Sequence, residues 1–194
     1  SGTILLLNAR SNHQSTLKVK VLRGPVVESV YGLGTVVSAR TYTLKTGVTT
    51  QVRSISVKEG ELVQNGKQLI SLDSIGIQKA PFTGTVTNIG YKVGENVFPQ
   101  TPIITLVDLT DRYLTVSLEQ EGALRVRPGQ NALLSFESLR GQKYAGKIRS
   151  IFPNEGQFIV HIDVKAMPGE ILPGMTADVA IEIAKRDSAQ LVPT

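Results

Sequence analysis

The sequence predicts an all-β protein in which a small β-sandwich is followed by an antiparallel β-barrel. Two observations support this prediction. A strand–turn–strand stretch occurs twice in the first half of the chain, and short apolar stretches separated by turn residues fill the second half at even spacing. The composition agrees, because 41% of the residues are apolar and the 18 glycines and 9 prolines supply the turns that many short strands need.

The repeated stretch covers residues 52–73 and again residues 86–107, an offset of 34 positions. The offset aligns identical Val, Ile and Leu positions and a shared K-x-G-E turn, which begins at Lys58 in the first copy and at Lys92 in the second. The glycine of this turn supplies a backbone corner with positive φ. Two such units, each with one apolar face, can bury those faces against each other as a sandwich.

The N-terminal part predicts strands that are interrupted at Gly24-Pro25. Leu17, Val19 and Val21 alternate with polar residues before this break, and a second apolar stretch follows it. A further strand at residues 31–37 contains a G-x-G, but no helix and no third glycine follow as a dinucleotide-binding loop requires. We interpret these glycines as points of close approach or a bulge within a strand.

Positive charge is concentrated near the N-terminus of a chain whose net charge is +5. Up to residue 42 the only acidic residue is Glu28, against five basic residues: Arg10, Lys18, Lys20, Arg23 and Arg40. Aromatic residues do not alternate with these charges as in nucleic-acid binders, so no nucleic acid is predicted as a partner. One interpretation of this charge is that the N-terminal part lies near anionic lipid head groups. A basic end that is simply exposed to solvent explains the charge equally well.

Residues 109–184 predict the barrel. Five strands are expected at residues 114–118, 132–136, 146–151, 157–164 and 176–183. A short helix is expected at residues 121–126, before Pro128-Gly129.

The sequence contains no signature of catalysis or metal binding. G-x-S-x-G, H-E-x-x-H and P-loop motifs are absent, and so is cysteine. Asp108 and Asp111 fit a surface turn better than an acid–base pair. His161 lies in an alternating strand without a second ligand nearby in the sequence, so a packed or surface histidine is the better interpretation. We therefore predict no catalytic residues, no metal site and no cofactor.

Seven motifs in order resemble those of the periplasmic adaptor family, also called membrane fusion proteins, which serve resistance-nodulation-division and related exporters. They are GTVVSA (34–39), VKEGELVQNGKQLISLD (57–73), KAPFTGTV (79–86), YKVGENV (91–97), LVDLTDRYLTVSLEQ (106–120), GKIRSIFP (146–153) and ILPGM (171–175). The resemblance runs from about Val21 to the C-terminus.

The resemblance implies three domains. A biotinyl-lipoyl-like sandwich is expected at residues 41–108, a β-barrel at residues 109–184, and a partial membrane-proximal domain from residues 1–40 and 185–194. It implies a non-enzymatic adaptor in the periplasm of a Gram-negative bacterium, anchored to the inner membrane and lying near its surface. Such an adaptor self-associates into a ring, a trimer or a hexamer, and links an inner-membrane efflux transporter to an outer-membrane channel protein.

The chain departs from the family pattern at two places. Adaptors usually insert a long α-helical hairpin between the sandwich halves, whereas here only residues 74–78 join them. The hairpin is either naturally absent or has been deleted. In ILPGM, Leu172 stands where the family usually has Arg, so the polar contact of that Arg is not expected. The Pro-Gly corner that enters the last barrel strand is expected.

Two segments of the sandwich are candidate contact sites. By the resemblance, Glu95 and Asn96 of the second K-x-G-E turn would face the conduit of the ring; an ordinary exposed hairpin is the other interpretation of this turn. The tip that would face the outer-membrane channel consists of Ser74, Ile75, Gly76, Ile77 and Gln78.

Two alternatives to this function remain open. The same sandwich serves lipoyl and biotin carrier domains, which present a Lys at the hairpin tip. Residues 74–78 contain no Lys, and Lys79 directly precedes Ala80-Pro81, so a carrier domain fused to a barrel is less favoured. The other alternative is an adaptor of an ATP-driven exporter, which has the same architecture.

Overall fold

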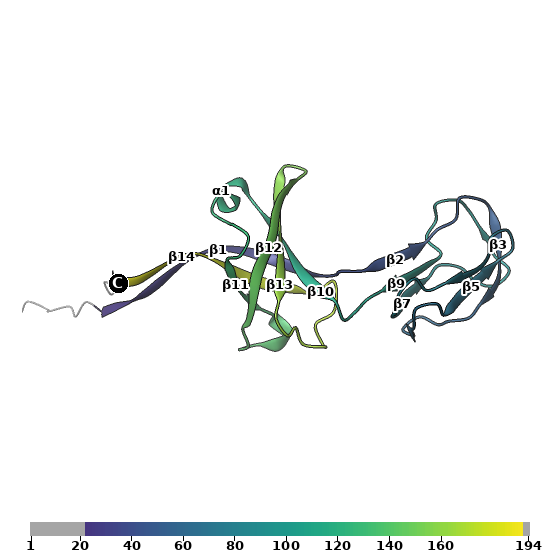
Figure 1. Ribbon diagram of the computed structural model, residues 1–194, viewed down its shortest axis with the longest axis horizontal. Coiled ribbons are helices and arrows are strands. Elements are labelled where there is room, and N and C mark those ends of the chain that lie inside the picture. Colours follow the sequence, from purple (N-terminus) through teal and green to yellow (C-terminus); the bar gives the residue numbers. More distant parts are fainter. Residues whose placement is uncertain (1–21, 192–194) are drawn as a thin grey trace, which may run out of the picture. The chain divides into compact units, whose positions relative to one another are not determined.

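The structure is a computed structural model that describes residues 22–191. Residues 28–184 form one compact unit that contains both β domains (Figure 1). The other unit comprises residues 1–27 and 185–194, and the predicted contribution of residues 1–21 and 192–194 to a membrane-proximal domain lies outside the described residues.

The barrel is closed and contains six strands in the order β1-β10-β13-β12-β11-β14. The strands are β1 (Leu22–Ser38), β10 (Arg112–Leu118), β11 (Asn131–Ser135), β12 (Tyr144–Asn154), β13 (Gln157–Val164) and β14 (Thr176–Leu191). Alternate side chains of these strands point inward and fill the barrel with aliphatic residues around Phe136. A short helix α1 (Gln120–Ala123) and a 3₁₀ helix η1 (Glu137–Leu139) lie in its connections. The predicted all-β class is confirmed.

The glycines of the G-x-G motif let strand β1 lie close to its neighbours. A Cβ atom on Gly34 would lie 2.8 Å from Leu114 Cδ2 and 2.9 Å from Val179 Cγ2, and one on Gly32 would lie 2.7 Å from Val116 Cγ1. These partners are buried side chains of β10 and β14. The interpretation of the motif as a point of close approach within a strand is confirmed.

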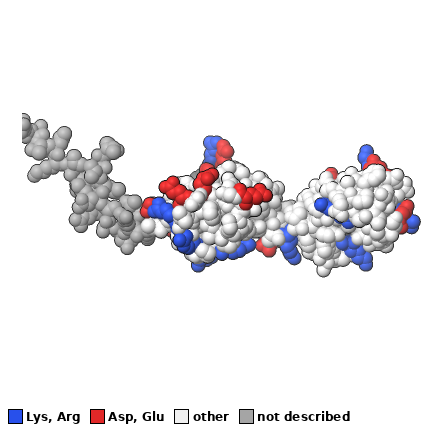
Figure 2. Space-filling model, turned by 90° about the horizontal axis from the view of Figure 1, so that it is seen from above, with Lys and Arg blue, Asp and Glu red and all other residues white. Residues whose placement is uncertain are grey.

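The sandwich consists of two four-stranded sheets, ordered β2-β9-β7-β4 and β6-β5-β3-β8. Its strands are β2 (Thr41–Leu44), β3 (Thr50–Ile55), β4 (Leu62–Val63), β5 (Gln68–Leu72), β6 (Gly76–Lys79), β7 (Gly84–Ile89), β8 (Asn96–Val97) and β9 (Ile104–Val107). Its core is a separate cluster of buried aliphatic side chains. On the face shown in Figure 2, acidic and basic side chains of the sandwich lie among each other without a stripe of one sign.

The two copies of the repeat interlock. Within each copy the long strands pair, β3 with β5 and β7 with β9. The short strand of each copy pairs with the other copy instead: β4 pairs with β7, and β8 pairs with β3. The two sheets are therefore related strand by strand through the 34-residue offset, and neither copy can complete its sheet alone.

Two predictions about the N-terminal part are wrong. First, β1 continues through Gly24-Pro25, which is tolerated where a strand needs no backbone donor at the proline. Second, residues 34–38, assigned to a membrane-proximal domain, pair with β10 and belong to the barrel. The barrel needs β1 to close, and residues 109–184 alone would leave an open edge between β10 and β14.

The Pro-Gly corner before β14 lies where the motif predicts. Gly174 has a φ of 94°, its N–H donates to the carbonyl of Val36 at 2.8 Å, and β14 begins two residues later. Leu172 makes no side-chain polar contact, and another arginine holds this loop. The Arg112 guanidinium of β10 donates to the carbonyls of Pro168 at 3.2 Å and of Ile171.

In the part of the chain that the structure describes, no helix has both the length and the apolar character to cross a membrane.

Candidate functional site

The predicted tip is a tight hairpin between β5 and β6. Leu72 is paired with Gly76, whose φ is 71°, so Asp73, Ser74 and Ile75 form the turn. Gly76, Ile77 and Gln78 are the first residues of strand β6 rather than loop residues. Ile75 and Ile77 are 39% and 53% exposed, so an edge strand and its turn present two large apolar side chains to solvent.

The two K-x-G-E turns have the same geometry. Glu61 accepts a hydrogen bond from the backbone N–H of Lys58 at 2.9 Å, and Glu95 accepts one from Lys92 at 2.8 Å. Gly60 has a φ of 83° and Gly94 a φ of 88°, which a residue with a Cβ adopts only at a cost. The glutamates of the repeat therefore have a structural role, the closing of their own turns.

Each turn is also bound to the opposite copy of the repeat. Gly60 donates to the carbonyl of Val86 at 2.7 Å, and Gly94 donates to the carbonyl of Val52 at 2.8 Å. In return, the N–H groups of Val86 and Val52 donate to the carbonyls of the two turn glutamates, at 3.0 and 2.9 Å. The two bonds of Val52 fix the position of the second turn, and with it Glu95, on strand β3.

Strand β3 brings the tip and the second turn together. Gln51 accepts a hydrogen bond from the N–H of Asp73 at 3.0 Å, while its side-chain amide donates to the carbonyl of Gly94 at 2.8 Å. The buried Thr50 hydroxyl accepts from the N–H of Ser74 at 3.0 Å. The exposed Asn96 pairs with Gln51 in the β3–β8 ladder. Sequence reasoning missed Thr50 and Gln51, because the register that places them between the two segments is not visible in the sequence.

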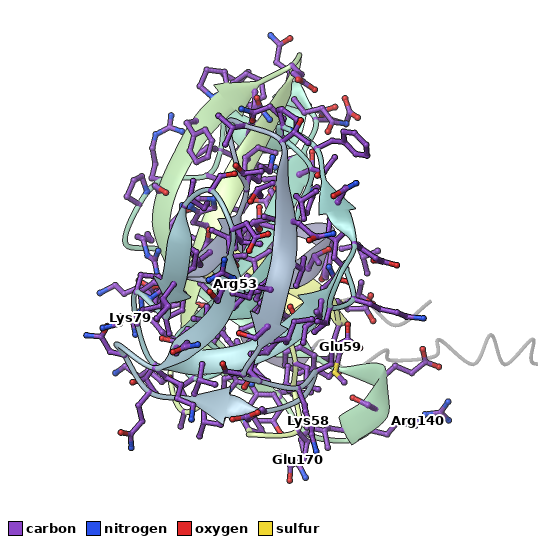
Figure 3. All side chains as sticks on the ribbon, turned by 90° about the vertical axis from the view of Figure 1, so that its right-hand side faces the viewer. Arg53, Lys58, Glu59, Lys79, Arg140 and Glu170 are labelled. Carbon is purple, nitrogen blue, oxygen red and sulfur yellow. The ribbon has the colours of Figure 1, made fainter. Side chains whose placement is uncertain are left out.

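A surface ion pair flanks the tip. Arg53 Nε donates to Asp73 Oδ1 at 2.8 Å, and both side chains are largely exposed, so the pair contributes little to stability. Lys79, the first lysine after the tip in the sequence, lies at the far end of β6 opposite Gln68, with its side chain exposed (Figure 3). Carrier domains present their lysine at the turn itself, and here the turn has none.

The two copies differ in the polarity of equivalent exposed positions. Val93 and Phe98 of the second copy are 61% and 60% exposed, and their counterparts in the first copy are Glu59 and Gln64. The same turn thus folds with polar side chains at these positions, so folding does not require the apolar ones. At these two positions the second copy presents apolar side chains to solvent where the first copy presents polar ones.

The prediction of a surface turn at Asp108 and Asp111 is half wrong. Asp111 is exposed, but Asp108 is 2% exposed and accepts hydrogen bonds from the N–H and hydroxyl of Thr110, at 2.9 and 2.6 Å, and from the Arg40 guanidinium. Burial alone would raise the pKa of Asp108, but these hydrogen bonds outweigh it and hold the pKa well below its ordinary value. The bond to Thr110, two residues on, is an Asx turn, a signal that the sequence does contain.

His161 lies in the barrel wall, half-buried between two aromatic rings. Its ring centroid is 4.8 Å from that of Tyr113 and 5.1 Å from that of Phe152. Burial and the nearby Arg149 guanidinium lower the pKa of His161. Among the described residues no group of three His, Asp or Glu side chains is placed to hold a metal ion.

Comparison with curated proteins gives short matches. No protein-family model matches the chain. The Multidrug resistance protein MdtN of Escherichia coli K12 is 28% identical over 86 residues, which cover 42% of this chain and 25% of MdtN. The chain thus matches about a quarter of the length of this relative.

Solved structures with the same fold cover most of the chain. MacA from Actinobacillus actinomycetemcomitans has a TM-score of 0.78 at 17% identity, covering 89% of this chain and 84% of MacA. The membrane fusion protein Spr0693 from Streptococcus pneumoniae has a TM-score of 0.67 at 14% identity, covering 80% of this chain and all of that chain (100%). The chain has the β-domain fold of a membrane fusion protein. The resemblance drawn from the seven motifs is therefore confirmed at the level of the fold. In this chain the halves of the sandwich are joined at the short β5–β6 turn.

Proposed function

We propose that the chain is the β-domain part of a periplasmic adaptor that links an inner-membrane efflux transporter to an outer-membrane channel. The observation that carries this proposal is the combination of a duplicated sandwich with a closed barrel, the fold shared with MacA and Spr0693. The weak sequence match to a multidrug resistance protein supports a role in efflux. In this role the chain catalyses no reaction and acts through its contacts.

The sheet β6-β5-β3-β8 supports assigning both contacts to one face of the sandwich. Ile75 and Ile77 would contact the outer-membrane channel through their exposed side chains. In a ring of three or six copies, Glu95 and Asn96 would face the conduit. Gln51 would hold the two contacts at fixed positions on β3, through its carbonyl to Asp73 of the tip hairpin and through its side-chain amide to Gly94 of the turn.

The unit formed by residues 1–27 and 185–194 would be the membrane-proximal part. Its basic residues, among them Lys18, Lys20 and Arg23, suit a position next to anionic lipid head groups of the inner membrane. The adaptor would then be periplasmic and anchored at that membrane.

Affinity purification from cross-linked membranes tests the proposal. The tagged chain, expressed in its source organism, should retain an inner-membrane transporter and an outer-membrane channel, both identified by mass spectrometry. The class of the retained transporter also separates a resistance-nodulation-division exporter from an ATP-driven one. Recovery of neither membrane protein would contradict the proposal. An increase in intact mass after co-expression with lipoate or biotin ligase would indicate a carrier domain instead.

A further inference from the structure

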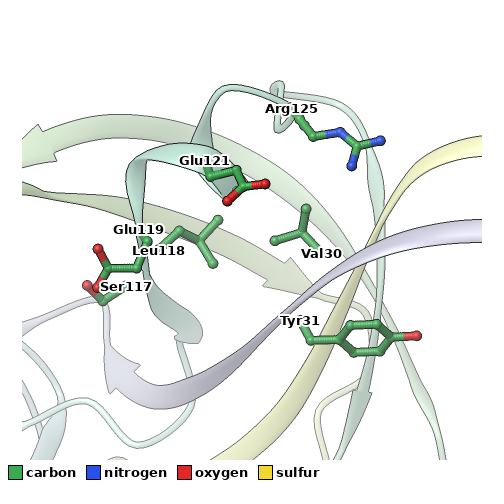
Figure 4. A pocket seen from close by; sticks show the side chains of 8 residues that line it. Val30, Tyr31, Ser117, Leu118, Glu119, Glu121 and Arg125 are labelled. Atoms are coloured by element: carbon green, nitrogen blue, oxygen red, sulfur yellow. The ribbon is translucent and has the colours of Figure 1, made fainter.

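The barrel carries an open groove that the proposed contacts of the sandwich do not use. It lies between strand β1 and the segment around helix α1, and its volume is about 360 Å³ (Figure 4). Val30 and Leu118 contribute apolar surface, and Tyr31, which is 77% exposed, lies at its edge. An open groove of this size suits a few side chains of a peptide segment better than an enclosed small molecule.

The wall formed by α1 is held in place by packing. Ala123 and Val126 are buried in the barrel core, and a Cβ atom on Gly122 would lie 3.1 Å from Val30 Cγ1, so glycine allows the helix to approach β1. Arg125 pairs with Glu28 of β1. The groove is therefore a feature of the folded barrel and does not depend on a bound partner.

The rim of the groove carries uncompensated negative charge. Glu119 and Glu121 are exposed and make no ion pair with any described residue, whereas the charge of Arg125 is matched by Glu28. Figure 2 shows acidic side chains gathered on the face of the barrel that carries α1. Next to these carboxylates, Leu124 is 63% exposed, which places a large apolar side chain beside the charge.

We propose that this groove binds a short segment of a partner protein that presents a Lys or Arg side chain next to an apolar one. The two carboxylates attract the cation, and Tyr31, Val30 and Leu118 bury the apolar side chain. The same negative rim repels phosphates, so neither nucleic acid nor an anionic membrane surface fits this groove. The site requires only the folded barrel, so a test of binding at this groove does not depend on the proposed role of the chain as an adaptor.

Amide chemical shifts of the ¹⁵N-labelled full chain test the proposal directly. The probe is the hexapeptide acetyl-Gly-Arg-Leu-Arg-Leu-Gly-amide, with a twin in which Glu replaces both Arg residues. The basic peptide should shift the amides of Tyr31, Gly122 and Leu124, and the acidic twin should not. Binding should weaken as the Debye length falls from about 10 Å at 0.1 M salt to about 3 Å at 1 M.

Two double variants that remove the same number of charges distinguish binding at the groove from non-specific electrostatic attraction to the protein. Glu119→Gln with Glu121→Gln should weaken binding of the basic peptide about threefold to tenfold. The control, Glu170→Gln with Asp178→Asn, removes two exposed carboxylates elsewhere on the barrel and should change binding by less than about twofold. The spectra of the variants also report whether they are folded. Absence of shifts at the groove, equal binding of the acidic twin, or equal effects of the two double variants would overturn the proposal.

Discussion

Replacement of Asp108 by alanine should destabilise the unit formed by residues 28–184. The side chain is 3% exposed and accepts two hydrogen bonds from Thr110 and two from Arg40. It lies where β9 of the sandwich ends and the chain enters the barrel. Ser38 at the end of β1 donates to the carbonyl of Asp108 at 2.7 Å, so the residue connects both chain segments of this junction.

The size of the effect follows from these contacts. Hydrogen bonds to a charged group are worth about 1.5–3 kcal/mol each when buried. Thr110 is exposed and the Arg40 side chain is 55% exposed, so water replaces part of what the substitution removes. We therefore expect a loss of about 2–3 kcal/mol in the free energy of unfolding. For a unit of this size this corresponds to a fall of about 4–12 °C in Tm.

Thermal unfolding followed by circular dichroism measures this loss, with Asp111→Ala as the control. Asp111 is exposed and its side chain accepts no hydrogen bond from a described residue, so its removal should cost less than about 0.5 kcal/mol. The pKa of Asp108 is lowered by folding, so its contribution is complete above the unfolded value of about 3.9. The contribution is lost as the pH falls through the native pKa.

The difference in Tm between wild type and Asp108→Ala should therefore be constant above about pH 5 and shrink on further acidification. Equal stability of the two proteins at pH 7, or a difference that does not change down to pH 2, would refute this account of the junction.

Three further predictions concern substitutions in the turns, in strand β1 and in the barrel wall. Glu61→Ala and Glu95→Ala each remove one turn hydrogen bond, so both should lower the free energy of unfolding by about 0.5–1.5 kcal/mol. Only Glu95→Ala should reduce export in a complemented strain. Equal export by the two variants would contradict the assignment of Glu95 to the conduit. Gly34→Ala should cost about 1–3 kcal/mol by denaturant unfolding, because its Cβ meets buried side chains of β10 and β14, whereas Gly47→Ala, with no atom within 4 Å, should be neutral. The native pKa of His161 is lowered, so wild-type Tm should decline relative to His161→Gln as the pH falls below about 6.5, and a difference that does not vary with pH would exclude this titration.

The sequence predicts the repeating parts of the fold well and the long-range contacts poorly. The K-x-G-E turns and the alternating strands are local patterns, so the offset of 34 residues is enough to predict a sandwich of two equivalent halves. The exchange of β4 and β8 between the halves, and the position of Gln51 between tip and turn, depend on register, which local patterns do not specify. The sequence predicts Asp108 at the surface because carboxylates in turns usually lie there, whereas it is buried beside Arg40, which is distant in sequence.

Site-specific photo-cross-linking at Ile75 in cells of the source organism tests the proposed adaptor role most directly. Ile75 is the apolar residue of the turn that joins the sandwich halves, and it is exposed. A photoreactive amino acid at this position should form a light-dependent adduct with an outer-membrane channel protein, and the same amino acid at the exposed Lys165 of the barrel should not. Adducts of Ile75 with cytoplasmic proteins alone, or the same adducts from both positions, would contradict the proposal that this chain links a transporter to an outer-membrane channel.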